Sequence, residues 1–80
     1  MKHFIATFHS HFGTMRYKKL CDKQGLTARM MPVPRSLSSS CGTCVSFHAE
    51  EYPMDEAILL ELEQIVEVLE KGYLQVYHID

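Results

Sequence analysis

The residues best suited to chemistry lie in one segment, residues 32–44, with the sequence P-V-P-R-S-L-S-S-S-C-G-T-C. It holds Cys41, a thiol in a serine-rich loop six residues after Arg35. The thiolate is the reactive form of cysteine, and nearby cations or free backbone N–H groups favour it. The anion-stabilising neighbours that we predict for this thiol are Arg35, Ser38, Ser39, Ser40 and Gly42. A surface turn with an incidental cysteine is the alternative, because loops gather serine and glycine for turn geometry alone.

A second cysteine, Cys44, completes a C-x-x-C pattern with Cys41. In thioredoxin-like proteins this motif works at the start of a helix, but residues 43–48 alternate as a strand does. Extended chain would separate the two cysteines by about 10 Å, beyond the roughly 7 Å that a disulfide allows. A bridge would need a tight turn at Gly42. Cys44 is thus a candidate resolving thiol, and a thiol-disulfide redox protein stays an open alternative.

Metal, cofactor and enzyme chemistry have weaker support in the sequence. A structural zinc site needs four ligands, and no second C-x-x-C or H-x-x-x-H knuckle is present, so we predict no metal. There is no phosphate-binding glycine loop or dinucleotide fingerprint, so we expect no cofactor. A nucleophilic enzyme would need a base near Cys41, and spacing does not select among His9, His11 and His48. Enzyme activity stays open.

The elements that must position this segment follow from the hydrophobic pattern and the turn residues. Alternation and aromatic content predict strands over residues 3–8, 26–33, 43–48 and 73–79. Ser10 is placed to cap a helix over residues 11–24, which Gly25 would end. Two prolines at the end of the second strand favour an edge position for it.

The most regular apolar pattern spans residues 54–71. Ile58, Leu62, Ile65 and Leu69 recur at spacings of four, three and four, which predicts a helix with its glutamates facing solvent. The resulting order is β-α-β-β-α-β. We therefore predict an α+β, ferredoxin-like sandwich, with a four-stranded antiparallel sheet and two helices on one face.

Composition limits the classes of function. Eighty residues allow one small domain, residues 1–80, and the net charge of −2 argues against binding to nucleic acid or an anionic membrane. No apolar run approaches the roughly 18 residues of a membrane span. The first residues lack the apolar core and cleavage site of a secretory peptide, so we expect a cytoplasmic protein.

The motif in the loop also resembles a known family. Pro34-Arg35 followed by Ser39-Ser40-Cys41-Gly42, with F-I-A-T-F near the start, resembles the selenium/sulfur carrier-like family of small bacterial proteins. The resemblance covers nearly the whole chain. It implies that Cys41 is the carrier thiol, holding sulfur or selenium as a persulfide or selenosulfide. The implied partners are sulfur- or selenium-donating and accepting proteins, and the implied role is a non-catalytic carrier more than an enzyme.

Two features depart from that family. Its members usually show a threonine-histidine pair and an alanine where the first helix begins, whereas this chain has His9-Ser10-His11-Phe12-Gly13-Thr14. Cys44 also stands where the family has an ordinary apolar strand residue.

A protein-interaction or regulatory module is the alternative function. A ferredoxin-like sheet leaves edges and one face open, and such a face could support a homodimer. The side chains that we expect to be partly exposed there are Val45, Phe47, Tyr73 and Tyr77.

Overall fold

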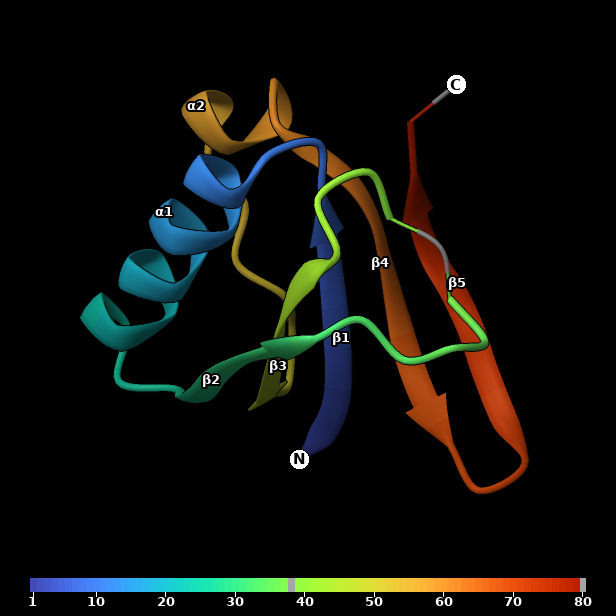
Figure 1. Cartoon of the computed structure of the whole chain (residues 1–80). Helices are drawn as coiled ribbons and strands as arrows, with labels where there is room; N and C mark the ends of the chain where they lie inside the picture. Colours follow the sequence, from blue (N-terminus) through green and yellow to red (C-terminus); the bar gives the residue numbers. More distant parts are fainter. Residues whose placement is uncertain (38, 80) are drawn as a thin grey trace.

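One antiparallel sheet of five strands forms the framework of the described residues, 1–37 and 39–79 of the computed structural model (Figure 1). Ser38, predicted above as an anion-stabilising neighbour, lies outside the described residues. The strands run in the spatial order β2-β3-β1-β4-β5. Their bounds are β1 Lys2–Phe8, β2 Thr27–Pro32, β3 Thr43–Ala49, β4 Leu62–Leu69 and β5 Gly72–His78, and the two helices are α1 His11–Lys23 and α2 Glu56–Leu59.

The two helices pack on the same face of the sheet. Tyr17 and Cys21 of α1 and Ile58 of α2 share a buried cluster with apolar residues of three strands, listed by strand as Phe4, Ala6 and Phe8 of β1, Val45, Phe47 and Ala49 of β3, and Leu62 and Ile65 of β4. The Tyr17 hydroxyl, at the centre of this cluster, donates a hydrogen bond to the Pro53 carbonyl at 2.8 Å. The helix face thus carries most of the core and fixes α1 against the central strands.

The chain between β2 and β3 covers the opposite face. We call residues 33–37 and 39–42 the crossing loop, because this segment leaves β2, passes over β1 and β4 and returns to β3 (Figure 1). Its Leu37 packs against a smaller cluster of Ile5, Cys44 and Val66. Ile5, Cys44 and Val66 therefore stay buried although no helix of the described residues lies on their side of the sheet.

The predicted helix over residues 54–71 is wrong. Only Glu56–Leu59 is helical, with the Asp55 side chain accepting from the Ala57 N–H at 2.8 Å, and the following residues form β4. Both faces of β4 are covered, so apolar residues occur on both sides of it, and the strand also contains a bulge. The two covered faces and the bulge together give the apolar residues the same spacing as the buried face of a helix. The sheet consequently has five strands, so the four-stranded sheet of the predicted ferredoxin-like sandwich is wrong, whereas the predicted α+β class with two helices on one face of an antiparallel sheet is confirmed.

Other expectations are confirmed in the described residues. The first four elements occur in the predicted order, and Ser10 is the N-cap of α1, its hydroxyl accepting from the Gly13 N–H at 3.3 Å. The predicted exposed face is wrong in part, because Val45 and Phe47 are fully buried under the helices. No helix among the described residues has both the length and the apolar character that crossing a membrane requires.

Candidate functional site

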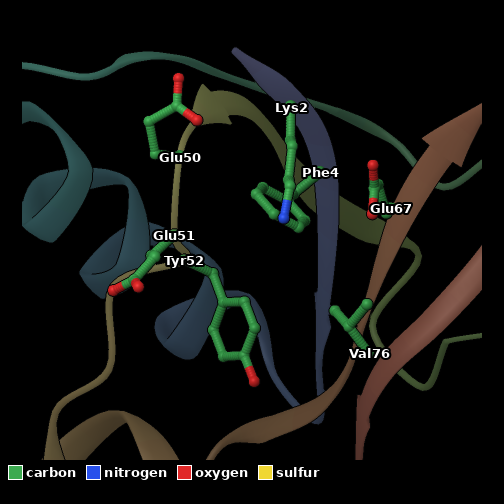
Figure 2. Close-up of a pocket in the computed structure, with 7 residues that line it drawn as sticks. All are labelled: Lys2, Phe4, Glu50, Glu51, Tyr52, Glu67 and Val76. Atoms are coloured by element: carbon green, nitrogen blue, oxygen red, sulfur yellow. The ribbon is translucent and has the colours of Figure 1, made fainter.

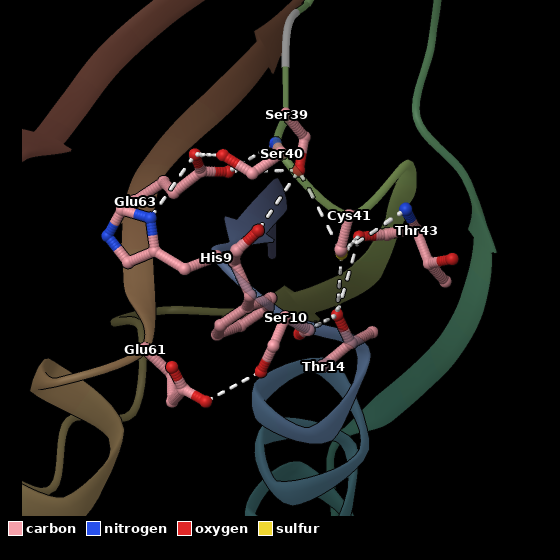
Figure 3. Close-up of polar contacts among 10 residues, drawn as sticks. His9, Ser10, Thr14, Ser39, Ser40, Cys41, Thr43, Glu61 and Glu63 are labelled. Atoms are coloured by element: carbon pink, nitrogen blue, oxygen red, sulfur yellow. Dashed lines mark hydrogen bonds and ion pairs between the residues drawn. The ribbon is translucent and has the colours of Figure 1, made fainter.

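Cys41 lies where the crossing loop returns to β3, beside the first turn of α1 (Figure 3). Gly42 follows it with a φ of 77°, a left-handed conformation that glycine adopts without strain. The carbonyl of Gly42 accepts a hydrogen bond from the Val33 N–H at 3.0 Å, and this bond joins the first and last residues of the crossing loop. The loop is thus fixed at its base, and Cys41 is presented at the end of the sheet where α1 begins.

Donor groups surround the sulfur of Cys41. The Thr43 N–H and the Thr14 hydroxyl each lie 3.5 Å from Sγ, and the Ser39 hydroxyl lies at 3.9 Å. As a thiol, Sγ donates to the Thr43 carbonyl at 3.1 Å. A thiolate or a terminal persulfide anion would instead accept from the Thr43 N–H and the Thr14 hydroxyl, while the nearer acceptor for the Ser39 hydroxyl is Glu63, and the positive end of the α1 dipole lies nearby. The arrangement therefore suits a sulfur that alternates between a protonated and an anionic form.

Glu63 anchors the part of the loop that leads into Cys41. Its Oε1 accepts from the Ser39 hydroxyl at 2.9 Å and the Ser40 N–H at 3.2 Å, and its Oε2 accepts from the Ser40 hydroxyl at 2.8 Å (Figure 3). Partial burial on its own would raise the pKa of Glu63, but the hydrogen bonds from Ser40 and Ser39, with nearby His9, hold this pKa below its usual value. Glu63 is therefore a carboxylate at neutral pH.

A bulge in β4 aims Glu63 at the loop. Thr7 of β1 is opposite Gln64, whereas the next residue, Phe8, is opposite Leu62, so Glu63 is the extra residue of the strand. Bulges re-aim a side chain in this way and are common next to functional sites. The side chain of Glu63 can consequently reach Ser39 and Ser40 at the end of the sheet.

The start of α1 is fixed against the same end of β4. The Ser10 hydroxyl donates to the Glu61 carboxylate at 2.6 Å, and the His9 N–H donates to the Glu61 carbonyl at 2.7 Å. Gly13 allows α1 to lie this close to Glu61, because a Cβ placed on residue 13 would lie only 2.5 Å from the Glu61 Cβ. One turn into the helix, the fully buried Thr14 is thereby placed at the sulfur of Cys41.

The predicted anion-stabilising residues are only partly brought together. Ser39 reaches Cys41, and Gly42 makes the left-handed turn, but the hydroxyl and N–H of Ser40 both bind Glu63. Arg35 is exposed, and within residues 1–37 and 39–79 it forms no hydrogen bond or ion pair. Their role toward an anion on Cys41 stays a prediction.

The other two cysteines differ sharply from Cys41. All three are free, but Cys21 and Cys44 are buried, whereas Cys41 is partly exposed. Burial, with a smaller contribution from Asp22, raises the pKa of Cys21 to about 12. Burial, with a smaller contribution from Cys41, raises the pKa of Cys44 to about 11. Neither is a nucleophile at neutral pH in the folded chain, and the resolving role of Cys44 stays a prediction.

None of the candidate histidine bases is hydrogen-bonded to Cys41 within the described part of the chain. His9 Nδ1 lies 3.5 Å from Glu63 Oε2, and His48 stacks on His3 with ring centroids 4.4 Å apart. No group of three or more His, Cys, Asp or Glu side chains among these residues is arranged to hold a metal ion. The geometry thus offers donors for an anion at Cys41 rather than a paired general base.

Sequence reasoning missed two residues of this site, Thr14 and Glu63. The predicted helix places Glu63 on its solvent face, but residue 63 lies in β4. The β-branched residues Ile65, Val66 and Val68 are the signal for a strand in this segment. The sequence around Thr14 does not indicate that it belongs to the site, because only the return of the crossing loop places it near Cys41.

A hollow of about 410 Å³ lies at the end of the sheet away from Cys41 (Figure 2). Phe4, Tyr52 and Val76 form its apolar part, and Lys2, Glu50 and Glu67 are among its charged residues. No cysteine, serine or histidine is among the described residues that line it. The nucleophile and its donors are therefore concentrated at the Cys41 end.

Two comparisons with known proteins place the chain in a family. A model of the family described as "Putative Se/S carrier protein-like" matches residues 3–79. The chain is also similar to the uncharacterized protein YtiA of Escherichia coli (strain K12), with 38% identity over 45 residues, which are 56% of this chain and 53% of YtiA. The match thus spans about half the length of this curated relative. No solved structure matches the chain.

Proposed function

This chain belongs to the Se/S carrier protein-like family, and we propose that it carries sulfur or selenium on Cys41 and passes it to an acceptor protein. The observation that supports this most strongly is the contrast among the three cysteines. Cys41 alone is partly exposed, and its sulfur has an amide and two hydroxyls within 3.9 Å. The other two thiols are buried and protonated at neutral pH.

Loading is a thiol exchange that needs no oxidant. The Cys41 thiolate attacks the outer sulfur of a cysteine persulfide on a donor protein, and the sulfur–sulfur bond of the donor breaks. A new sulfur–sulfur bond forms on Cys41, and the donor cysteine leaves as a thiolate. A selenosulfide on the donor reacts in the same way, with selenium as the transferred atom. Delivery repeats the exchange, with a thiolate of the acceptor attacking the outer atom.

The neighbours of Cys41 have distinct roles in this proposal. The Thr43 N–H and the Thr14 hydroxyl stabilise negative charge on the sulfur, whereas the Ser39 hydroxyl, 3.9 Å from the sulfur, donates its hydrogen to Glu63. Glu63 holds the loop through Ser39 and Ser40. Gly42 leaves open space on its own outer side, since a Cβ placed on it would meet no described atom within 4 Å apart from its two neighbours in the chain.

Arg35 and Cys44 have secondary roles. Arg35 is exposed on the crossing loop, where its charge is available to an approaching persulfide anion. Cys44 is a resolving thiol only if local opening of the crossing loop exposes it. The carrier works in the cytoplasm, where a reducing environment keeps all three cysteines as thiols between transfers.

Intact mass spectrometry after incubation with a small-molecule persulfide tests the proposal. We expect the protein to gain one sulfur atom, reversibly under a thiol reductant. Cys41→Ser should abolish the adduct, and Cys44→Ser, the matched control, should retain it. An adduct that persists in Cys41→Ser, or no adduct on the folded wild-type protein, contradicts the assignment.

A protein-interaction module is the second candidate, and the edge strand β5 favours it. Tyr73 is 38% exposed and Leu74 is 51% exposed, and β5 contains no proline or lysine to block pairing with another strand. Pairing of β5 with β5 of a second copy would give a homodimer. Analytical ultracentrifugation of the wild-type protein and of Leu74→Lys tests this. A dimer that Leu74→Lys dissociates supports it, and a wild-type monomer at micromolar concentration contradicts it.

A further inference from the structure

Four polar side chains form a square on the face of the sheet that carries the crossing loop. Arg29 of β2 is directly opposite Ser46 of β3, and Thr27 is directly opposite His48. Side chains in such cross-strand pairs lie about 5 Å apart, and the two pairs are separated by about 7 Å along the strands. Together with Ala28 they line a hollow of about 250 Å³. A guanidinium, an imidazole and two hydroxyls therefore converge on one small space.

Arg29 has no charge partner in the part of the chain that the structure describes. Among the described residues it forms no hydrogen bond or ion pair, and no carboxylate lines the hollow. The pKa of the neighbouring His3 is affected by the charge of Arg29. Burial lowers the pKa of His3 first, and His48 and Arg29 lower it further, with no acidic group acting in the opposite direction. Arg29 thus brings a positive charge to this part of the face, although the whole chain carries a net charge of −2.

His3 also orients one of the hydroxyls. Its Nε2 lies 2.7 Å from the Oγ of Ser46, which is only 7% exposed, and its ring stacks on His48 at 4.4 Å. When the Nε2–H tautomer of His3 donates to Ser46, the hydroxyl hydrogen of Ser46 is free to donate into the hollow. The ring stacking holds His48 at the edge of the same space.

From this arrangement we propose that the square of Thr27, Arg29, Ser46 and His48 binds a small oxyanion, either a free phosphate or sulfate or the phosphoryl group of a larger molecule. The planar fork of Arg29 matches two oxygens of such an anion, and the Ser46 and Thr27 hydroxyls supply donors to the others. A metal cation is disfavoured by the unpaired guanidinium. The site does not involve Cys41, so this proposal can be correct or wrong whether or not the protein transfers sulfur.

A titration with inorganic phosphate at constant ionic strength, followed by the backbone amide signals in NMR, tests the site. We expect saturable shifts centred on residues 27–29 and 46–48. Arg29→Gln should weaken binding about tenfold or more, because it removes a charge-assisted hydrogen bond. Arg16→Gln, an exposed arginine on α1 with the same change of charge, should alter binding less than about twofold, as expected for screened long-range charge.

A second arm of the titration distinguishes the two sources of the anion. Phosphoserine should bind as tightly as phosphate if the site accepts the phosphoryl group of a larger molecule. It should bind more weakly if the site accommodates only a free anion. Ser46→Ala provides a second variant and should also weaken phosphate binding. Shifts that do not saturate, or equal weakening in Arg29→Gln and Arg16→Gln, would overturn the proposal. The amide spectrum of each variant shows in the same experiment that it is folded.

Discussion

Glu63 holds Ser40 by both its hydroxyl and its backbone N–H, at 2.8 and 3.2 Å, so that a carboxylate on β4 fixes the loop residue next to Cys41. The two residues are far apart in sequence, and only the bulge in β4 and the return of the crossing loop bring them together. The position of the proposed carrier thiol therefore depends on a contact between the two halves of the chain.

Replacing this carboxylate should loosen the loop. Glu63→Gln removes the charge that accepts three hydrogen bonds from Ser39 and Ser40, and we expect a loss of about 1–2 kcal/mol in the free energy of unfolding at pH 7. Urea denaturation measures this loss. Glu70→Gln, at an exposed position, is the matched control and should change the free energy by less than about 0.5 kcal/mol.

The effect of Glu63 should also depend on pH. Its pKa is lowered in the folded chain from the usual 4.5, so the ionised carboxylate stabilises the fold above that value. The stabilisation is lost as the pH falls through the lower pKa of the folded state. The difference in stability between wild type and Glu63→Gln should therefore be largest near pH 7 and shrink below pH 4.5. A difference that stays constant down to pH 2 would show that Glu63 acts by packing and not by charge.

The three cysteines should differ in reactivity toward an alkylating reagent. At pH 7 iodoacetamide should modify Cys41 in the folded protein and leave Cys21 and Cys44 unmodified. Each unit of pKa above the ambient pH lowers the thiolate fraction about tenfold, and the pKa values of these two are about 12 and 11. Mass spectrometry of the digested protein counts the modified sites. In urea all three should react, which is the control, and early modification of Cys44 in the folded protein would contradict the burial described for it.

The hydroxyl of Thr14 should assist the anionic sulfur. Thr14→Val keeps the shape of the side chain and removes the group that lies 3.5 Å from Cys41 Sγ. We expect the rate of persulfide formation on Cys41 to fall roughly fivefold, which corresponds to about 1 kcal/mol for one hydrogen bond. Time-resolved mass spectrometry measures that rate. Thr27→Val, far from Cys41 on β2, should leave it unchanged.

Gly13 should be required for close packing and not for flexibility. Alanine favours a helix by about 1 kcal/mol over glycine, but a Cβ on residue 13 would lie 2.5 Å from the Glu61 Cβ. The clash should dominate, and Gly13→Ala should destabilise the fold by roughly 1–2 kcal/mol, as overpacking does. Thermal unfolding compares it with Lys19→Ala on the exposed side of α1, which should be neutral. A Gly13→Ala protein as stable as the wild type would show that α1 can move away from β4 at no cost.

Much of the first half of the fold was predictable from local signals. Ser10, Gly25 and the alternation in residues 43–48 act within a few positions of the chain, so their consequences can be read without the tertiary structure. The segment 54–71 could not be read in this way. Its apolar residues face two covered sides of a bulged strand, and a helix stripe has the same spacings.

The site was predictable only at its centre. Cys41 and its serine-rich loop are adjacent in sequence, and the resemblance to the carrier family depends on them. Thr14 and Glu63 come from α1 and β4, and the misassigned helix placed Glu63 in solvent. Arg35 is close to Cys41 in sequence, but the two residues make no contact in the part of the chain that the structure describes.

The most direct test of the account is the location of a transferred sulfur in the wild-type protein. After reaction with a persulfide donor and alkylation, fragmentation mass spectrometry assigns the added atom to one cysteine. We predict that it lies on Cys41 and that Cys21 and Cys44 carry none. An added sulfur on Cys44, or on no cysteine while the protein remains folded, would contradict the central claim that Cys41 is the carrier.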